Sequence, residues 1–138
     1  MLDDNCIFCK IAAGEIPSRK IYEDKDLIAI MDLSPTSKGH SLIIPKEHYT
    51  NIYDIDEEIA GKVMKTAKKL ATKMTVALNC DGFNLLQNNG ETAGQTMFHF
   101  HMHLIPRYKD ADNNMLKFTS VSFSDEEMDA IRDQIIKD

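Results

Sequence analysis

The chain has 138 residues, of which 43% are hydrophobic and 28% are charged. This balance is typical of a globular protein rather than a disordered one, and the length suits a single domain over residues 1–138. The net charge of −6 argues against a general nucleic-acid surface. No stretch approaches the length of a transmembrane helix, so we expect neither a membrane nor a nucleic acid as a partner.

The three cysteines give a first indication of the cellular environment. They are Cys6, Cys9 and Cys80, an odd number that disfavours a disulfide scaffold. The first residues, Met-Leu-Asp-Asp, do not resemble a signal peptide. Unpaired thiols without a targeting signal predict a reducing, cytoplasmic location.

The predicted elements alternate short strands with helices. A helix over residues 5–13 is expected first, closed by Gly14. Strands are expected next at 20–23, 27–31 and 40–44, from their apolar runs and the turn residues between them. A long helix is predicted over 56–78 from the apolar stripe of Ile59, Val63, Leu70, Met74 and Leu78.

The second half of the chain completes the predicted fold. Asp54 and Glu57 form a plausible capping pair for the long helix, and Ser124 and Glu127 for a C-terminal helix. Strands are expected at 83–87 and 98–105. Because strands outnumber helices and short turns join most of them, the class is α+β: an antiparallel sheet of about five strands, a long helix and a C-terminal helix.

The most informative segment is His-Phe-His-Met-His-Leu-Ile at residues 99–105. Side chains alternate between the two faces of a strand, so His99, His101 and His103 would share one face. The apolar residues between them would pack on a core. Imidazole titrates near neutral pH, and it serves as a nucleophile, a proton carrier or a metal ligand.

Two kinds of chemistry suit such a face. Imidazoles can bind zinc with an open position for water, or a neutral imidazole can attack phosphorus and carry the phosphoryl group covalently. The preceding loop favours the second, because its side chains and glycine backbone offer donors for phosphate oxygens. Its only carboxylate is Glu91, and its donors are Asn88, Gly90, Gly94, Gln95 and Thr96.

These motifs resemble the histidine-triad (HIT) family of nucleotide hydrolases and transferases, and most closely its bacterial Hint-like members. The triad matches the family signature His-φ-His-φ-His-φ-φ, where φ is apolar. Companion motifs occur in the family's order, at 6–11, 15–17, 22–24, 31–35, 39–48, 88–90 and 94–96. The resemblance implies a HIT-like fold whose sheet extends across a homodimer.

The resemblance also implies roles for individual residues. His101 would be the nucleophile on the α-phosphorus, and His40 would support the catalytic ring by hydrogen bonding. Asp32 would hold the ribose hydroxyls, and Leu33 would border the base. The α-phosphate and leaving group would lie against His103, Asn88, Gly94, Gln95 and Thr96.

Cys6 and Cys9 form a Cys-x-x-Cys motif, which alone is compatible with redox activity, metal binding or two ordinary helix residues. A closed zinc site needs two further ligands. The resemblance supplies His48 and His99, and so implies a structural Zn²⁺ on Cys6, Cys9, His48 and His99. No organic cofactor is expected.

The expected function is hydrolysis of nucleoside 5′-phosphoramidates, or related purine nucleoside monophosphate conjugates, through a nucleotidyl-His101 intermediate. The alternatives are a dinucleoside polyphosphate hydrolase of the same family, a hydrolase with zinc on the triad, and a non-catalytic nucleotide-binding module. The tryptophan-containing C-terminal segment of animal Hint-type proteins is absent, since the chain has no Trp. The leaving group and the base therefore stay open.

Overall fold

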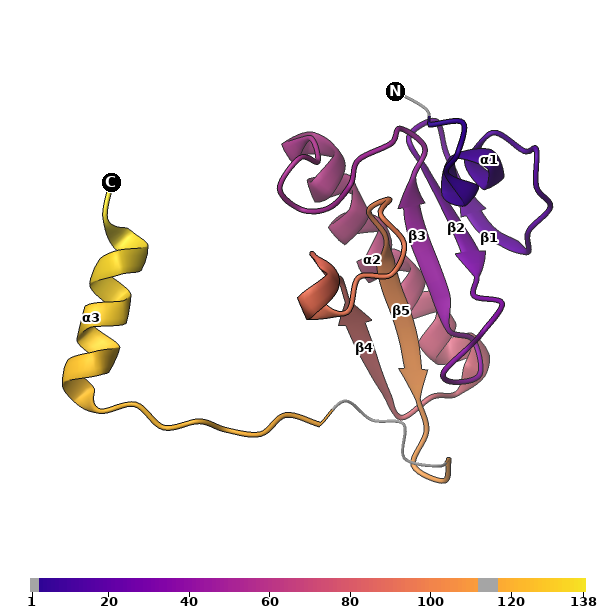
Figure 1. The fold of residues 1–138 in the computed structure, drawn as a ribbon. Coiled ribbons are helices and arrows are strands. Elements are labelled where there is room, and N and C mark those ends of the chain that lie inside the picture. Colours follow the sequence, from indigo (N-terminus) through magenta and orange to yellow (C-terminus); the bar gives the residue numbers. More distant parts are fainter. Residues whose placement is uncertain (1–2, 112–116) are drawn as a thin grey trace.

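The computed structural model describes residues 3–111 and 117–138 (Figure 1). Five antiparallel strands form one sheet in the order β1-β2-β3-β5-β4. The α+β class predicted from the sequence is therefore confirmed. The elements are α1 (Ile7–Ala12), β1 (Lys20–Glu23), β2 (Leu27–Met31), β3 (Ser41–Pro45), α2 (Glu57–Leu78), β4 (Gly82–Leu86), the 3₁₀ turn η1 (Glu91–Ala93), β5 (Met102–Arg107) and α3 (Asp125–Ile136).

Both faces of the central strands are buried, each in its own hydrophobic cluster. In β2, Leu27 and Ala29 belong to the cluster beneath α2, whereas Ile28 and Ile30 belong to the cluster that includes α1. This follows from the two-residue period of a strand. A strand covered on both sides reads as an unbroken apolar run, which explains the sequence Leu-Ile-Ala-Ile of β2.

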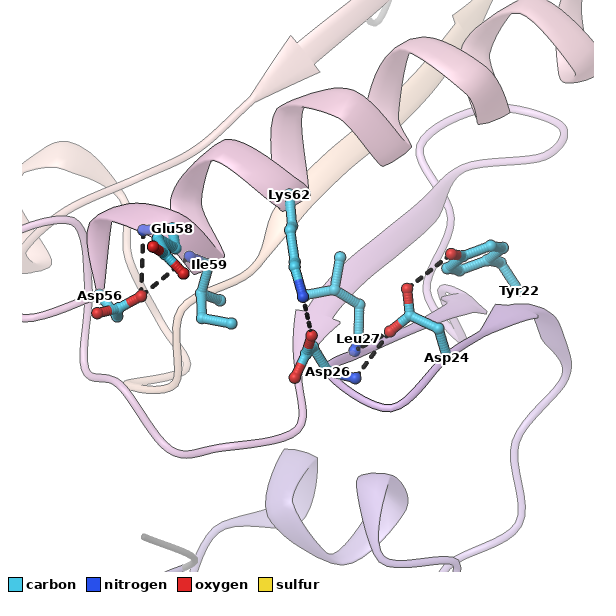
Figure 2. Close-up of polar contacts among 8 residues, drawn as sticks. All are labelled: Tyr22, Asp24, Asp26, Leu27, Asp56, Glu58, Ile59 and Lys62. Atoms are coloured by element: carbon cyan, nitrogen blue, oxygen red, sulfur yellow. Dashed lines mark hydrogen bonds and ion pairs between the residues drawn. The ribbon is translucent and has the colours of Figure 1, made fainter.

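Helix α2 lies along one face of the sheet and is tied to the β1–β2 turn. Figure 2 shows Lys62 of α2 reaching the carboxylate of Asp26, while the Asp24 carboxylate accepts bonds from the backbone N–H groups of Asp26 and Leu27. The turn and the helix are therefore held together by an ion pair as well as by the apolar core.

The predicted capping pair of α2 is wrong by two residues. The N-cap is Asp56, whose carboxylate accepts from the N–H groups of Glu58 and Ile59 (Figure 2). Asp54 instead accepts from the backbone of the preceding turn, at Thr50 and Asn51. Both aspartates can accept hydrogen bonds from backbone N–H groups. Asp54 bonds to the turn, and Asp56 therefore caps the helix.

Strand β5 runs from Met102 to Arg107. Its first residue lies four positions later in the chain than the predicted start. Upstream of Met102 the backbone leaves the ladder, and the Phe100 N–H donates to the Tyr49 carbonyl at 2.6 Å. The predicted alternation nevertheless persists, because Phe100, Met102 and Leu104 all enter the cluster beneath α2. His99 and His101 thus lie in a connecting segment rather than in the strand.

Helix α3 stands clear of the sheet, beyond β4 (Figure 1). Its predicted capping pair is confirmed, because Ser124 and Glu127 form a reciprocal capping box. Every described residue from 117 to 138 is exposed. No helix among the described residues has the length and apolar character that crossing a bilayer requires.

Candidate functional site

His101 is a buried member of the triad, with 8% of its surface exposed. Its Nδ1 lies 2.8 Å from the carbonyl oxygen of His99. A carbonyl only accepts, so Nδ1 carries the proton and donates it. The lone pair of the neutral ring is therefore on Nε2.

His103 is oriented by a chain of hydrogen bonds that begins at the backbone. The N–H of Thr36 donates to Nδ1 of His40 at 3.0 Å, which places the His40 proton on Nε2. That Nε2 donates to Nδ1 of His103 at 2.9 Å and lies 3.6 Å from a carboxylate oxygen of Asp32. The remaining proton of His103 is thus on its own Nε2, which makes that atom a donor.

Burial keeps these rings neutral. It lowers the pKa of His101 and of His40, and it lowers the pKa of His103 to about 4. The Asp32 carboxylate opposes the shift in all three rings. With ring centroids 4.9 Å apart, His101 and His103 form a neutral pair that offers one lone pair and one donor.

Phe8 of α1 packs edge-on against two of the three histidines. Its ring centroid lies 5.2 Å from that of His101 and 5.9 Å from that of His99. This contact restrains the ring of His101. Sequence reasoning did not single out Phe8, although its place between Cys6 and Cys9 in a predicted helix was visible.

The loop that follows β4 is braced by Gln95. This side chain is 2% exposed; its oxygen accepts from the Gly90 N–H at 2.8 Å, and its amide donates to the carbonyls of Thr50 and Met97 at 2.7 and 3.0 Å. The predicted contact of Gln95 with the phosphate or leaving group stays a prediction. The polar atoms of Gln95 are used to hold the loop.

Other predicted ligand contacts remain open toward solvent. Thr96 and Leu33 are exposed, and Asn88 is half-buried with its amide 3.5 Å from the Gly94 carbonyl. Gly94 has a φ of +94°, a conformation that side-chain-bearing residues rarely adopt. Asp32 follows β2, where its other carboxylate oxygen accepts from the Ser34 N–H at 2.8 Å.

A second cluster brings the four predicted metal ligands together. The donor atoms of Cys6, Cys9, His48 and His99 all lie within 4.8 Å of one another. Cys6 caps α1 and Cys9 follows in its first turn, which places both sulfurs on one side. The His99 Nδ1 lies 3.3 Å from the sulfur of Cys6 and 3.5 Å from that of Cys9.

These donors fit tetrahedral zinc. Bonds of about 2.0–2.3 Å place the ligand atoms of such a site about 3.3–3.8 Å apart, and the Cys9 sulfur lies 3.4 Å from Nδ1 of His48. The His99 Nε2 donates to the Pro45 carbonyl at 2.8 Å, which leaves the Nδ1 lone pair facing the sulfurs. Burial lowers the pKa of His99 to about 4, so the ring is neutral, as a ligand must be.

The same geometry disfavours zinc on the triad itself. The Nδ1 of His99 faces the cysteine sulfurs, and a hydrogen bond joins the Nε2 of His40 to the Nδ1 of His103. A second group of three donors, Asp32, His40 and His103, is close enough for a metal. However, the proton between the two rings occupies the electron pairs that a metal would need.

The family follows from comparison with known proteins. Residues 13–110 match the HIT domain model. The chain belongs to the HIT family. The protein named "Protein hit" from Bacillus subtilis is 49% identical to this chain over 109 residues, which are 79% of this chain and 75% of that protein. The adenosine 5′-monophosphoramidase hnt1 of Schizosaccharomyces pombe is 37% identical over 131 residues, 95% of this chain and 96% of that protein.

Solved HIT structures share the fold. A HIT family protein from Bacillus subtilis superposes with a TM-score of 0.91 at 42% identity, covering 97% of this chain and 96% of its own. A zinc-bound histidine triad family protein from Mycobacterium smegmatis superposes with a TM-score of 0.75 at 32% identity, covering 93% of this chain and 91% of its own.

Proposed function

We propose that this HIT protein is a hydrolase that cleaves purine nucleoside 5′-phosphoramidates, or related nucleoside monophosphate conjugates, with His101 as the nucleophile. The observation that carries the proposal is the bond from the His101 Nδ1–H to the His99 carbonyl. It fixes the tautomer whose Nε2 lone pair can attack phosphorus. The Schizosaccharomyces pombe relative, named an adenosine 5′-monophosphoramidase, supports the substrate class.

The reaction proceeds in two displacements. The Nε2 of His101 forms a bond to the α-phosphorus as the bond to the leaving nitrogen breaks, and that nitrogen takes a proton from solvent and departs as the amine. The charge that develops on the ring is stabilised at Nδ1, whose proton is already held by a carbonyl oxygen. Water then attacks the same phosphorus and gives a proton to solvent, the P–N bond to His101 breaks to restore the neutral ring, and the nucleoside monophosphate leaves.

Other residues position the nucleotide. The Nε2–H of His103 donates to a phosphate oxygen, supported through His40. Asp32 holds the ribose hydroxyls, and Leu33 lies along the base. The phosphate and leaving group lie against Asn88, Gly94 and Thr96, while Gln95 acts by holding the loop that carries them.

Zinc on Cys6, Cys9, His48 and His99 is structural in this proposal. Four protein ligands leave no position for an activated water. When bound, the ion ties α1 to the segment that carries the triad. The donor distances and the zinc-bound Mycobacterium smegmatis relative support the assignment.

A homodimer completes the proposal. Strand β4 is an edge of the sheet, and an edge must be paired, covered or charged to avoid uncontrolled association. Two copies related by a two-fold axis pair their sheets there, which is the commonest closed arrangement. Because free thiolates bind zinc only while reduced, we assign the protein to the cytoplasm.

The test is a substrate panel at fixed pH. We expect kcat/KM for adenosine phosphoramidate and guanosine phosphoramidate to exceed that for diadenosine polyphosphates. A polyphosphate leaving group calls for local cations, and residues 88–98 contain no Lys or Arg. A clear preference for polyphosphates would replace this substrate class and keep the nucleophile. Nucleotide binding without turnover of any compound would make the protein a binding module.

A further inference from the structure

The C-terminal arm, residues 117–138, contributes nothing to the core of its own chain. All of its described residues are exposed, including Phe118, Val121 and Phe123 at 88%, 75% and 50%. Helix α3 is amphipathic, since Met128, Ile131 and Ile135 recur at helical spacing on one stripe. An isolated helix of 12 residues is only marginally stable in water. Its apolar stripe therefore needs a surface to pack against.

The superposition on a solved relative extends into the arm. The superposition on the Bacillus subtilis HIT structure covers 97% of this chain, which extends into α3, with a TM-score of 0.91. In Figure 1 the arm runs away from its own sheet and past the β4 edge. This is the edge at which a second copy would continue the sheet.

A matching surface lies at the opposite edge of the sheet. An apolar groove of about 350 Å³ opens between the C-terminal half of α2 and strands β1 and β2. Leu70, Met74 and Ala77 of α2 line it together with Ile21 and Met31. Along its side runs the basic face of α2, formed by the exposed side chains of Lys65, Lys69 and Lys73.

The charge of α3 and the length of the arm both suit binding to the groove of a second copy. Helix α3 carries five acidic side chains and one arginine, whereas α2 carries five lysines and two glutamates. A five-stranded sheet is roughly 24 Å wide. The chain between β5 and α3 can span at most about 60 Å when extended, so the arm is long enough to cross the sheet of a second copy.

We infer that the arm of each chain crosses to a second copy of this chain and seats the Met128, Ile131 and Ile135 stripe of α3 in that copy's groove. The acidic side chains of α3 then face the basic face of the partner's α2. Under two-fold symmetry the exchange is reciprocal, so each chain both gives and receives an arm. The contact adds to the pairing of the β4 edges and is distinct from it.

The direct test is an NMR experiment on the full-length protein. A mixed sample of isotope-labelled and unlabelled chains would be examined by filtered nuclear Overhauser spectroscopy. We expect contacts between the Ile131 and Ile135 methyl groups of one chain and Leu70, Met74 or Ala77 of the other. Contacts within a single chain, contacts to another surface, or an arm without contacts would each overturn the inference, even if the protein is a dimer.

A matched pair of variants tests the energetics. Ile131→Asp places a charge on the apolar stripe, and Ala130→Asp places the same charge beside it, off the stripe. In sedimentation equilibrium we expect Ile131→Asp to raise the dimer Kd at least tenfold and Ala130→Asp to change it less than threefold. Equal effects of the two variants would overturn the inference. Because the arm lies outside the core, both variants keep the fold of residues 3–111, which circular dichroism checks.

Discussion

The Nε2 of His40 lies 2.9 Å from the Nδ1 of His103, although 63 positions separate the two residues in the chain. The bond sets the tautomer of His103 and leaves the proton of that ring on its Nε2. The bond thus joins the loop before β3 to strand β5. The arrangement makes His40 a positioning residue, with consequences that kinetics can measure.

Replacing His40 by Ala is expected to lower kcat roughly tenfold, because one hydrogen bond worth about 1–1.5 kcal/mol is lost. KM for the phosphoramidate should change much less. His40→Gln retains a donor at a similar distance and should recover part of the rate. Equal kcat values for His40→Ala and the unchanged protein, from steady-state kinetics, would remove the positioning role.

Gln95 gives a second kinetic prediction. Gln95→Leu leaves the Gly90 N–H and the Thr50 carbonyl without their partners, each at a cost of about 1–3 kcal/mol. We expect a lower Tm, a raised KM and a lower kcat together, since the loop carries Asn88 and Thr96. Thr92→Ala in the exposed turn η1 is the control. If Gln95→Leu lowers only kcat and spares the Tm, Gln95 contacts the substrate instead.

Stability should fall on mild acidification. The pKa of His103 is about 4 in the folded protein, below the ordinary value of 6.5, and that of buried His40 is also lowered. At a pH between about 4 and 6.5, these histidines are protonated in the unfolded chain but not in the folded protein. The free energy of unfolding therefore falls as the pH drops from 6.5 toward 4. The charge of Asp32 raises the pKa of His40 and so reduces this loss of stability, whereas the charge of Arg107 lowers that pKa and increases the loss. Urea unfolding in this pH range measures it, and His40→Gln should flatten the slope.

Metal removal should act on stability before it acts on chemistry. Elemental analysis is expected to find about one zinc per chain, and chelation should lower the Tm. Cys9→Ser should lose the metal, whereas Cys80→Ser should keep it, because Cys80 lies outside the four-residue cluster. A metal-free preparation with an unchanged Tm would contradict the structural zinc site.

The sequence predicted the parts of this molecule that depend on local pattern. The alternation of Phe100, Met102 and Leu104 with the histidines correctly predicted which side chains enter the core. The apolar stripe predicts the start of helix α2 to within one residue. Such features depend on spacing along the chain, which is directly visible.

Features that depend on distant partners were missed. Strand β5 was predicted too early because its start is decided by where the β3 and β4 ladders end, at Met102 and His103. The cap at Asp56 rather than Asp54 was decided by a competing turn. The bracing bonds of Gln95 run to Thr50, 45 positions away, and no local pattern indicates them.

The central claim is that His101 carries the nucleotide. The most direct measurement is rapid mixing of the protein with adenosine phosphoramidate, an alkaline quench, and mass spectrometry of the peptide that contains residues 99–103. We predict a nucleotidyl adduct on His101 that forms and decays at least as fast as steady-state turnover. His101→Gln should show neither adduct nor turnover while still binding AMP. An adduct on another residue, or full turnover by His101→Gln, would contradict the account.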